Sequence, residues 1–138
     1  MTLVLSLEED IIPVAEKCLS LGAGSVLLKC GAPGLYLACS DRMDGVGSRL
    51  ELDAAAWDGF GAFEKSYQVK EFRSGTGAGD VSIAAFLASI LEGAGPKTAI
   101  ENAAAAGALA CTSYDAISSI RPLSKIRAMI DDGWAKVQ

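Results

Sequence analysis

The spacing of apolar residues along the chain predicts a mixture of helices and strands. Apolar residues recur at helical spacing over residues 10–21, and the capping-box pattern from Ser6 to Glu9 predicts a first turn ahead of that helix. Four short runs are instead β-compatible, because they are brief, apolar and bounded by turn residues. These runs lie at residues 2–5, 25–30, 35–39 and 67–72.

The two central runs predict a hairpin, since a Gly-Ala-Pro-Gly sequence at residues 31–34 separates them. Residues 40–66 carry glycine and aspartate with weak periodicity, which predicts a long loop with a single helical turn at 54–57.

The second half of the chain is predicted to be helical. Residues 81–92 are apolar nearly all round and predict a buried helix, and residues 97–112 predict a helix of small residues. Pro122 begins a terminal amphipathic helix. This order of elements predicts an α/β fold in which helices pack on a sheet that contains an antiparallel hairpin. No repeat or linker divides residues 1–138, so we expect one domain.

The amino-acid composition of the chain argues against several classes of protein function. The net charge of −5 and the lack of a basic cluster argue against nucleic-acid binding. The absence of histidine excludes Ser-His-Asp and Cys-His catalysis. Four scattered cysteines suggest free thiols in a reducing compartment. No apolar run approaches the roughly 20 residues of a membrane span, and the N-terminus lacks the basic region of a signal peptide. We therefore expect a cytoplasmic protein without a membrane partner.

The sequence Gly75-Thr76-Gly77-Ala78-Gly79-Asp80 is the strongest candidate for a functional site. Alternating glycines let the backbone turn sharply and approach a ligand closely. Because an apolar helix follows, the N–H groups of the turn would lie at a helix N-terminus, which favours a phosphate. Asp80 would stand beside that phosphate, which suggests phosphoryl transfer. The alternative is that Asp80 only caps the helix.

The turn differs from a Walker A loop, which ends in Lys-Ser/Thr, and from the G-x-G-x-x-G dinucleotide fingerprint. Its residues resemble the second signature of the PfkB/ribokinase family of carbohydrate kinases. The hairpin at 28–37 is similar to that family's strand-G-x-x-G-strand element, and residues 99–106 are similar to its alanine-rich helix. The resemblance covers most of the chain in the family's order. It implies a ribokinase-like three-layer sandwich, of which residues 1–138 would be the C-terminal, nucleotide-binding part.

The resemblance also implies roles for the residues of the turn. Asp80 would be the general base that accepts the proton of a sugar hydroxyl as it attacks the γ-phosphate of ATP. The backbone N–H groups of Gly77, Ala78 and Gly79 would form an anion hole, and Thr76 would contact the nucleotide. Mg²⁺ would bridge the phosphates, so that this chemistry needs no histidine.

Other residues would complete the site by the same resemblance. Gly31, Gly34, Asn102 and Gly107 would shape the adenosine pocket, and Glu9 would help to hold the metal. Simpler structural roles stay open for these residues. The two hairpin glycines could serve only the turn, Asn102 could be a satisfied helix polar residue, and Glu9 could belong only to the capping box with Ser6.

The sequence departs from the family pattern in three places. Ser74 and Gly75 replace the usual Asp-Thr, which puts a monovalent-cation site in doubt, and Ser6 replaces the Asn of the N-x-x-E motif. The N-terminal half of the family, which carries the substrate motif and the lid, has no counterpart here. We therefore expect either that residues 1–138 are a fragment of a longer kinase, or that they form a homo-oligomer or pair with a separate N-terminal half. The alternative to a sugar kinase is a non-catalytic nucleotide- or phosphate-binding module derived from one.

Overall fold

A computed structural model describes residues 4–43 and 50–138 of the chain. Its centre is an antiparallel sheet of three strands in the order β1-β2-β3. The elements in chain order are a π-helical turn η1 (Leu7–Ile11), α1 (Ile12–Ser20), β1 (Ser25–Lys29), β2 (Gly34–Cys39), α2 (Ala54–Trp57), β3 (Gly61–Lys65), α3 (Ala78–Leu91), α4 (Pro96–Ala110) and α5 (Leu123–Asp131).

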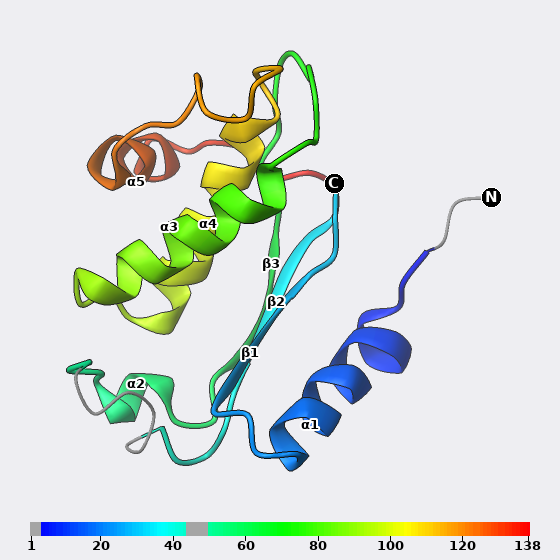
Figure 1. Ribbon diagram of the computed structural model, residues 1–138, viewed down its shortest axis with the longest axis vertical. Coiled ribbons are helices and arrows are strands. Elements are labelled where there is room, and N and C mark those ends of the chain that lie inside the picture. The colour runs from blue at the N-terminus through cyan, green and yellow to red at the C-terminus, as the bar shows by residue number, and fades with distance from the viewer. Residues whose placement is uncertain (1–3, 44–49) are drawn as a thin grey trace.

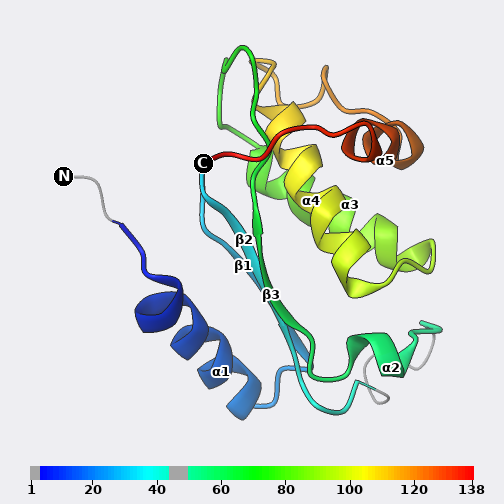
Figure 2. The ribbon, with the colours of Figure 1, turned by 180° about the vertical axis from the view of Figure 1, so that it is seen from behind.

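The described elements form three layers. Figure 1 shows α1 alone on one side of the sheet, with α3, α4 and α5 on the other, and the view from behind in Figure 2 gives the same arrangement. The predicted α/β fold and its hairpin are confirmed, with Lys29 at the end of β1 opposite Leu35 of β2.

The hydrophobic core lies between the sheet and the α3–α4 layer. Small residues dominate α4, where Ala103 and Ala105 are fully buried, and this lets α4 approach both α3 and the sheet closely. Trp57 of α2 closes one end of the core and packs edge-on against Phe86 of α3, with ring centroids 6.2 Å apart. The single helical turn predicted at residues 54–57 is confirmed, and its Trp57 belongs to the core.

The N-terminal region follows the prediction only in part. The Ser6 hydroxyl accepts a hydrogen bond from Glu9 N at 3.2 Å, as expected of an N-cap. The reciprocal bond comes from Asp10, whose carboxylate accepts from Ser6 N at 2.7 Å, so Glu9 does not complete the capping box. Of the strand predicted at residues 2–5, the first two residues lie outside the described chain, and Val4 and Leu5 are exposed and in no strand.

The third strand was predicted in the wrong place. β3 occupies residues 61–65 within the predicted loop, whereas Tyr67 forms only an isolated bridge to Lys136. The alternation at 67–72 resembles a strand, but Phe72 is 68% exposed, so the pattern does not reflect a buried face. The segment is held by the C-terminus: Gln68 N donates to Ala135 O at 2.8 Å.

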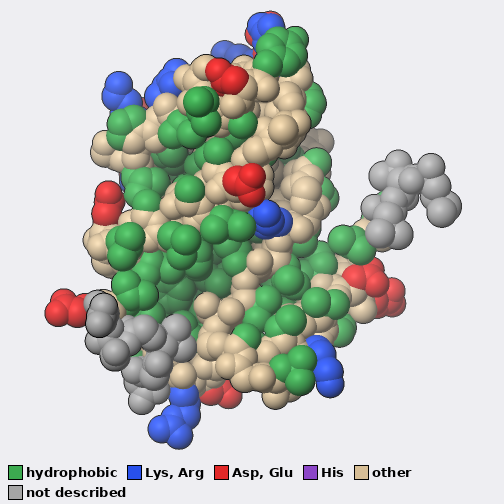
Figure 3. Space-filling model, in the orientation of Figure 1, with side chains coloured by type: hydrophobic (Ala, Val, Ile, Leu, Met, Phe, Trp, Pro, Cys, Tyr) green, Lys and Arg blue, Asp and Glu red, His purple; other side chains and the backbone are tan. Residues whose placement is uncertain are grey.

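The helix after the glycine turn is less buried than its composition predicts. α3 begins at Ala78, three residues earlier than expected, so that Asp80 lies in its first turn. One side of α3 packs on α4, while Ile83, Leu87 and Leu91 are 38%, 53% and 75% exposed. Figure 3 shows hydrophobic side chains gathered on the surface over this region.

Candidate active site

The glycine turn ends at a left-handed residue from which α3 starts. Gly77 is the N-cap of α3 with φ of +80°, and a Cβ there would come within 2.5 Å of the Ala116 methyl group. Only glycine meets both constraints without strain. Ala116, which is a non-glycine residue at positive φ, therefore packs directly on the turn.

The turn presents backbone donors at the start of α3. Ala78 N already donates to Gly75 O at 3.2 Å, whereas within the described residues the N–H groups of Gly77 and Gly79 form no hydrogen bond. Thr76 is exposed, and its N–H donates to the Ser74 hydroxyl at 3.2 Å. The unpaired donors and the helix dipole together make this end of α3 favourable to an anion.

Asp80 is not the cap of the helix. No side chain caps α3, and the carboxylate of Asp80 is exposed in the first turn without a hydrogen bond to another described residue. The alternative in which Asp80 serves only as a helix cap is therefore wrong. A carboxylate in this position is stabilised by the helix dipole and is accessible to a ligand at the turn.

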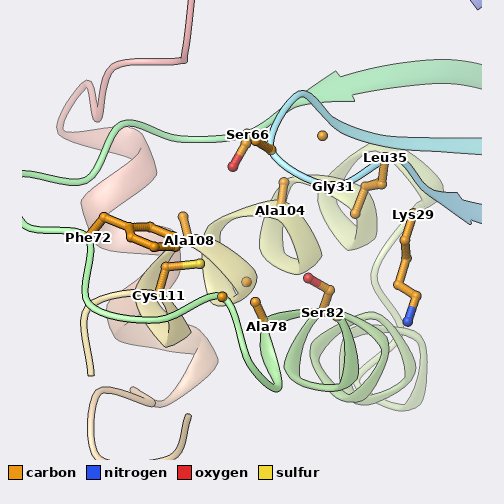
Figure 4. A pocket seen from close by; sticks show the side chains of 15 residues that line it. Lys29, Gly31, Leu35, Ser66, Phe72, Ala78, Ser82, Ala104, Ala108 and Cys111 are labelled. Carbon is orange, nitrogen blue, oxygen red and sulfur yellow. The ribbon is translucent and has the colours of Figure 1, made fainter. Parts of the chain in front are cut away.

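A cavity of about 320 Å³ opens beside the turn. Its walls come from the β1–β2 hairpin, the start of α3 and the second half of α4, as Figure 4 shows. Of the predicted site residues, the structure brings five together in this wall: Gly31, Gly34, Ala78, Gly79 and Gly107. A volume of this size is at the lower end of ordinary small-ligand pockets.

The cavity depends on two close backbone approaches. A Cβ on Gly107 of α4 would collide with the Ser82 hydroxyl of α3, so glycine sets the separation of these helices. Gly34 has φ of +141°, and a Cβ there would collide with the backbone carbonyl of Glu64 in β3. Both glycines thus have a packing reason for their identity, besides any contact with a ligand.

Asn102 lies outside the cavity wall. It is buried between α4 and α3, where its amide donates to the Ser89 hydroxyl at 3.0 Å. Ser89 in turn donates to Ala85 O at 2.7 Å. The Asn102 Oδ1 atom is buried without a hydrogen-bond partner among the described residues. The geometry gives Asn102 a role in joining the two helices.

Glu9 also lies away from the cavity. Its exposed side chain lines a separate groove between α1 and β1, together with Asp10, Lys17 and Leu28. No cluster of three or more metal-ligating side chains occurs within the described residues.

A thiol in the cavity wall is poorly suited to act as a nucleophile. Burial raises the pKa of Cys111, which keeps the thiol protonated at neutral pH. Its carbonyl has a structural role, because it accepts hydrogen bonds from Arg73 N at 2.7 Å and Ser74 N at 3.3 Å. The end of α4 thereby holds the start of the glycine turn.

Four polar or aromatic residues of the wall were not singled out from the sequence. Among the described residues Lys29 is the one charged side chain in the lining, Ser66 and Ser82 each contribute a hydroxyl, and Phe72 contributes an exposed aromatic ring. Figure 4 shows Lys29 and Phe72 at opposite ends of the cavity. Alternation along β1 could have placed Lys29 on the same face as Leu27, but Ser82 and Phe72 carried no comparable signal.

The fold and the site define an α/β protein in which a helix starts with unpaired N–H groups beside an accessible carboxylate. Comparison with protein families matches residues 5–122 to the pfkB family carbohydrate kinases, and the chain belongs to that family. The comparison with curated proteins gives no match.

Solved structures of ribokinase-family kinases share this fold. Ribokinase from Thermotoga maritima is 28% identical with a TM-score of 0.64, and the match covers 92% of this chain and 35% of that one. For Arabidopsis thaliana ribokinase, solved with ribose and ATP, the identity is 24%, the TM-score 0.69 and the coverage 88% and 34%. The Burkholderia thailandensis nucleoside kinase matches at 18% identity, with a TM-score of 0.62 and coverage of 82% and 31%. The chain thus spans about a third of the length of these structures.

None of the helices in the described parts of the chain combines the length and the apolar character needed to cross a bilayer.

Proposed function

We propose that this chain supplies the ATP-binding and catalytic-base part of a kinase that phosphorylates a hydroxyl of a sugar or sugar-like substrate. The observation that carries the proposal is the start of α3, where unpaired N–H groups, an accessible carboxylate and a cavity occur together. Family membership supports it, as do the relatives described as kinases of ribose and of nucleosides. In this proposal the chain corresponds to the C-terminal part of those proteins.

The proposed reaction is an in-line phosphoryl transfer. The substrate hydroxyl oxygen bonds to the γ-phosphorus of ATP, the bond to the bridging oxygen breaks, ADP leaves, and Asp80 takes the hydroxyl proton. The N–H groups of Gly77 and Gly79 stabilise the negative charge on the transferred group, and the Ala78 N–H joins them once it leaves Gly75 O. A magnesium ion bound with the nucleotide would supply further neutralisation of charge.

The cavity is the proposed nucleotide pocket. Gly31, Gly34 and Gly107 keep its walls free of side chains, so that a nucleotide can lie against the backbone of the hairpin and of α4. Thr76 would contact the phosphate chain from the exposed side of the turn. For Asn102 the burial between helices favours an indirect role, in which it fixes α4 against α3.

Substitution of Asp80 tests this proposal. We expect wild-type protein to bind ATP with Mg²⁺ in calorimetry and to phosphorylate a member of a sugar and nucleoside panel when the remaining part of the kinase fold is supplied as a second polypeptide. Asp80→Asn keeps the shape and removes the base, so turnover falls by roughly 10²- to 10⁴-fold while ATP affinity is retained. Absence of ATP binding in wild-type protein would contradict the proposal.

A second candidate function is the binding of a nucleotide or phosphate without catalysis, in which the chain acts through association. The exposed apolar side of α3 supports association, either with a second copy or with a polypeptide that supplies the rest of the fold. ATP binding without turnover under all pairings, unchanged by Asp80→Ala, would identify this module.

A further inference from the structure

The Ala116 methyl group lies where a side chain of Gly77 would otherwise extend. A Cβ built on Gly77 would be 2.5 Å from the Ala116 Cβ, which is closer than two such carbon atoms approach. Ala116 belongs to the segment between α4 and α5, and Figures 1 and 2 show that segment beside the turn before α3. Because glycine adopts φ of either sign easily, Gly77 has no steric restraint of its own, and the methyl group supplies one from outside.

Ala116 holds this place at a conformational cost. Its φ is +62°, and among residues 4–43 and 50–138 it is the only non-glycine residue with positive φ. The Cβ of an alanine in the left-handed region comes too close to the backbone carbonyl that follows it. Such a conformation persists only where the surrounding structure determines it. The residues on either side of Ala116 must therefore hold it.

Asp115 holds Ala116 from one side. Its carboxylate accepts hydrogen bonds from Ile117 N at 3.1 Å, from Ser118 N at 2.9 Å and from the Ser118 hydroxyl. These bonds close a turn across Ala116, which lies between the donors and the acceptor in sequence. The hydrogen bonds from Ser118, followed by the bond from Ile117 N, lower the pKa of Asp115 to about 2, so the acceptor is ionised at neutral pH.

The same segment is fixed to the end of α4. The buried Ser119 hydroxyl donates to Leu109 O at 2.7 Å, and a second hydrogen bond of 2.8 Å joins it to the Ser113 hydroxyl. Residues 113–119 thus form a loop whose base is anchored on α4 and whose tip is closed by Asp115. Since the base is anchored, closure of the tip holds Ala116 against Gly77.

We propose that Asp115 is a positioning residue for phosphoryl transfer: through Ala116 it fixes the backbone of Gly77 and so directs the unpaired N–H groups of the turn at the transferred phosphoryl group. This inference rests on the proposed function and adds to it a residue that does not line the cavity. Donors that are already directed at the developing charge stabilise the transition state more than the bound substrate. Loss of Asp115 therefore lowers kcat more than it weakens ATP binding.

Substitution of Asp115 tests the inference under the conditions used for the Asp80 variant. Asp115→Ala removes the acceptor, so kcat falls by about 10-fold, less than the roughly 10²- to 10³-fold cost of a whole donor, while the dissociation constant of ATP with Mg²⁺ changes by less than about threefold. Asp115→Asn keeps an oxygen acceptor and restores most of kcat. Asp132→Ala, which removes an exposed carboxylate at the end of α5, makes the same change in net charge and leaves kcat unchanged.

Ala116→Gly distinguishes positioning of the turn from a purely structural role. Glycine is unstrained at φ of +62°, and this relief offsets its greater freedom in the unfolded chain, so the urea midpoint of unfolding is unchanged or rises. The methyl group that restrains Gly77 is lost, so kcat falls by about 10-fold although the fold is no less stable. Wild-type kcat in this variant would limit Asp115 to a structural role and overturn the inference.

The outcomes separate this inference from the proposed function. If Asp80→Asn loses turnover while Asp115→Ala keeps the wild-type kcat, the role of Asp115 is wrong and the proposed function stands. If Asp115→Asn loses as much kcat as Asp115→Ala, the effect belongs to charge and not to the closed loop, and the inference is wrong. If wild-type protein gives no turnover with any pairing, the proposed catalytic function fails and this inference fails with it.

Discussion

The two predicted nucleotide-pocket glycines of the β1–β2 hairpin differ in their surroundings. Both have positive φ, of +72° at Gly31 and +141° at Gly34. Around Gly31 a Cβ would meet no atom within 4 Å, whereas at Gly34 it would collide with the backbone of β3. The first glycine is therefore required only by conformation, and the second by conformation and by strand packing together.

This difference predicts unequal effects of alanine substitution on stability. Gly31→Ala lowers the free energy of unfolding by about 1 kcal/mol, the cost of holding a non-glycine residue in the left-handed region. Gly34→Ala lowers it by more than about 3 kcal/mol, because the clash must separate β2 from β3. Urea denaturation of the two variants provides the comparison. Equal losses would contradict the role assigned to the β3 carbonyl.

At the residue scale, the sequence could predict the glycine turn because its spacing carries the signal directly. The location of Asp80 at a helix start follows from the same motif. Lys29 and Ser82 could not be identified in this way, since their places in the cavity wall depend on which residues the fold brings beside them. Their neighbours Gly79 and Gly107 lie 50 and 25 positions away along the chain.

At the element scale, one carboxylate joins α4 to α5. Glu101 of α4 pairs with Arg127 of α5 at 2.7 Å and with Lys97 one turn earlier at 3.1 Å. Burial alone would raise the pKa of Glu101, but the hydrogen bonds from Arg127 and Lys97 outweigh it and hold its pKa below the ordinary value of 4.5. A carboxyl whose pKa is lowered by folding stabilises the protein above that ordinary value.

Because folding lowers the pKa of Glu101, we expect the protein to lose stability in acid. The contribution of Glu101 is fully present at pH 7 and is lost as the pH falls from about 4.5 through the lowered pKa. Glu101→Gln lowers the free energy of unfolding by about 1 kcal/mol at pH 7 and by less at pH 3.5. Urea denaturation at the two pH values measures both differences.

The exposed α1 residue Glu16 provides the matched control for this experiment. Glu16→Gln removes the same charge without removing a described ion pair, and we expect little effect at either pH. A loss from Glu101→Gln that is equal at pH 7 and pH 3.5 would contradict the electrostatic explanation.

β3 was predicted poorly because the residues that it contacts lie far away along the chain. β3 contains two polar residues, and its buried Glu64 pairs with Lys136 near the C-terminus, so that no apolar alternation marks the strand. The hairpin was predicted well because its strands and turn are adjacent in sequence. Local signals were sufficient there, whereas β3 required knowledge of the tertiary contact.

At the scale of the whole molecule, the α3 surface is the largest departure from the buried helix predicted. Ile83, Leu87 and Leu91 recur every four residues and form an apolar stripe on one side of the helix. This stripe supports the proposed association.

Negative charges introduced into the apolar stripe are expected to weaken association. We expect wild-type protein to self-associate, or to bind a polypeptide that supplies the rest of the fold, in sedimentation experiments. Leu87→Glu with Leu91→Glu weakens that association by at least tenfold, because two carboxylates would have to be buried without partners. Since both side chains are more than half exposed, the free energy of unfolding of the dissociated chain changes by less than about 1 kcal/mol.

Replacement of two exposed polar residues elsewhere, Ser124→Glu with Lys125→Gln on α5, makes the same change in net charge and provides the control. A wild-type chain that stays monomeric on mixing and concentration, and binds no hydrophobic dye, would contradict the proposed association.

The C-terminal residues hold the segment that leads from β3 to the glycine turn. Trp134 donates its indole N–H to Gln68 O at 2.7 Å, and Val137 N donates to Ser66 O at 2.9 Å. Ser66 and Phe72 of that segment line the cavity. The docked C-terminal residues and the wall of the cavity therefore share one structural element. A ligand that binds this wall more tightly when the C-terminal residues are docked would strengthen their attachment by the same free energy.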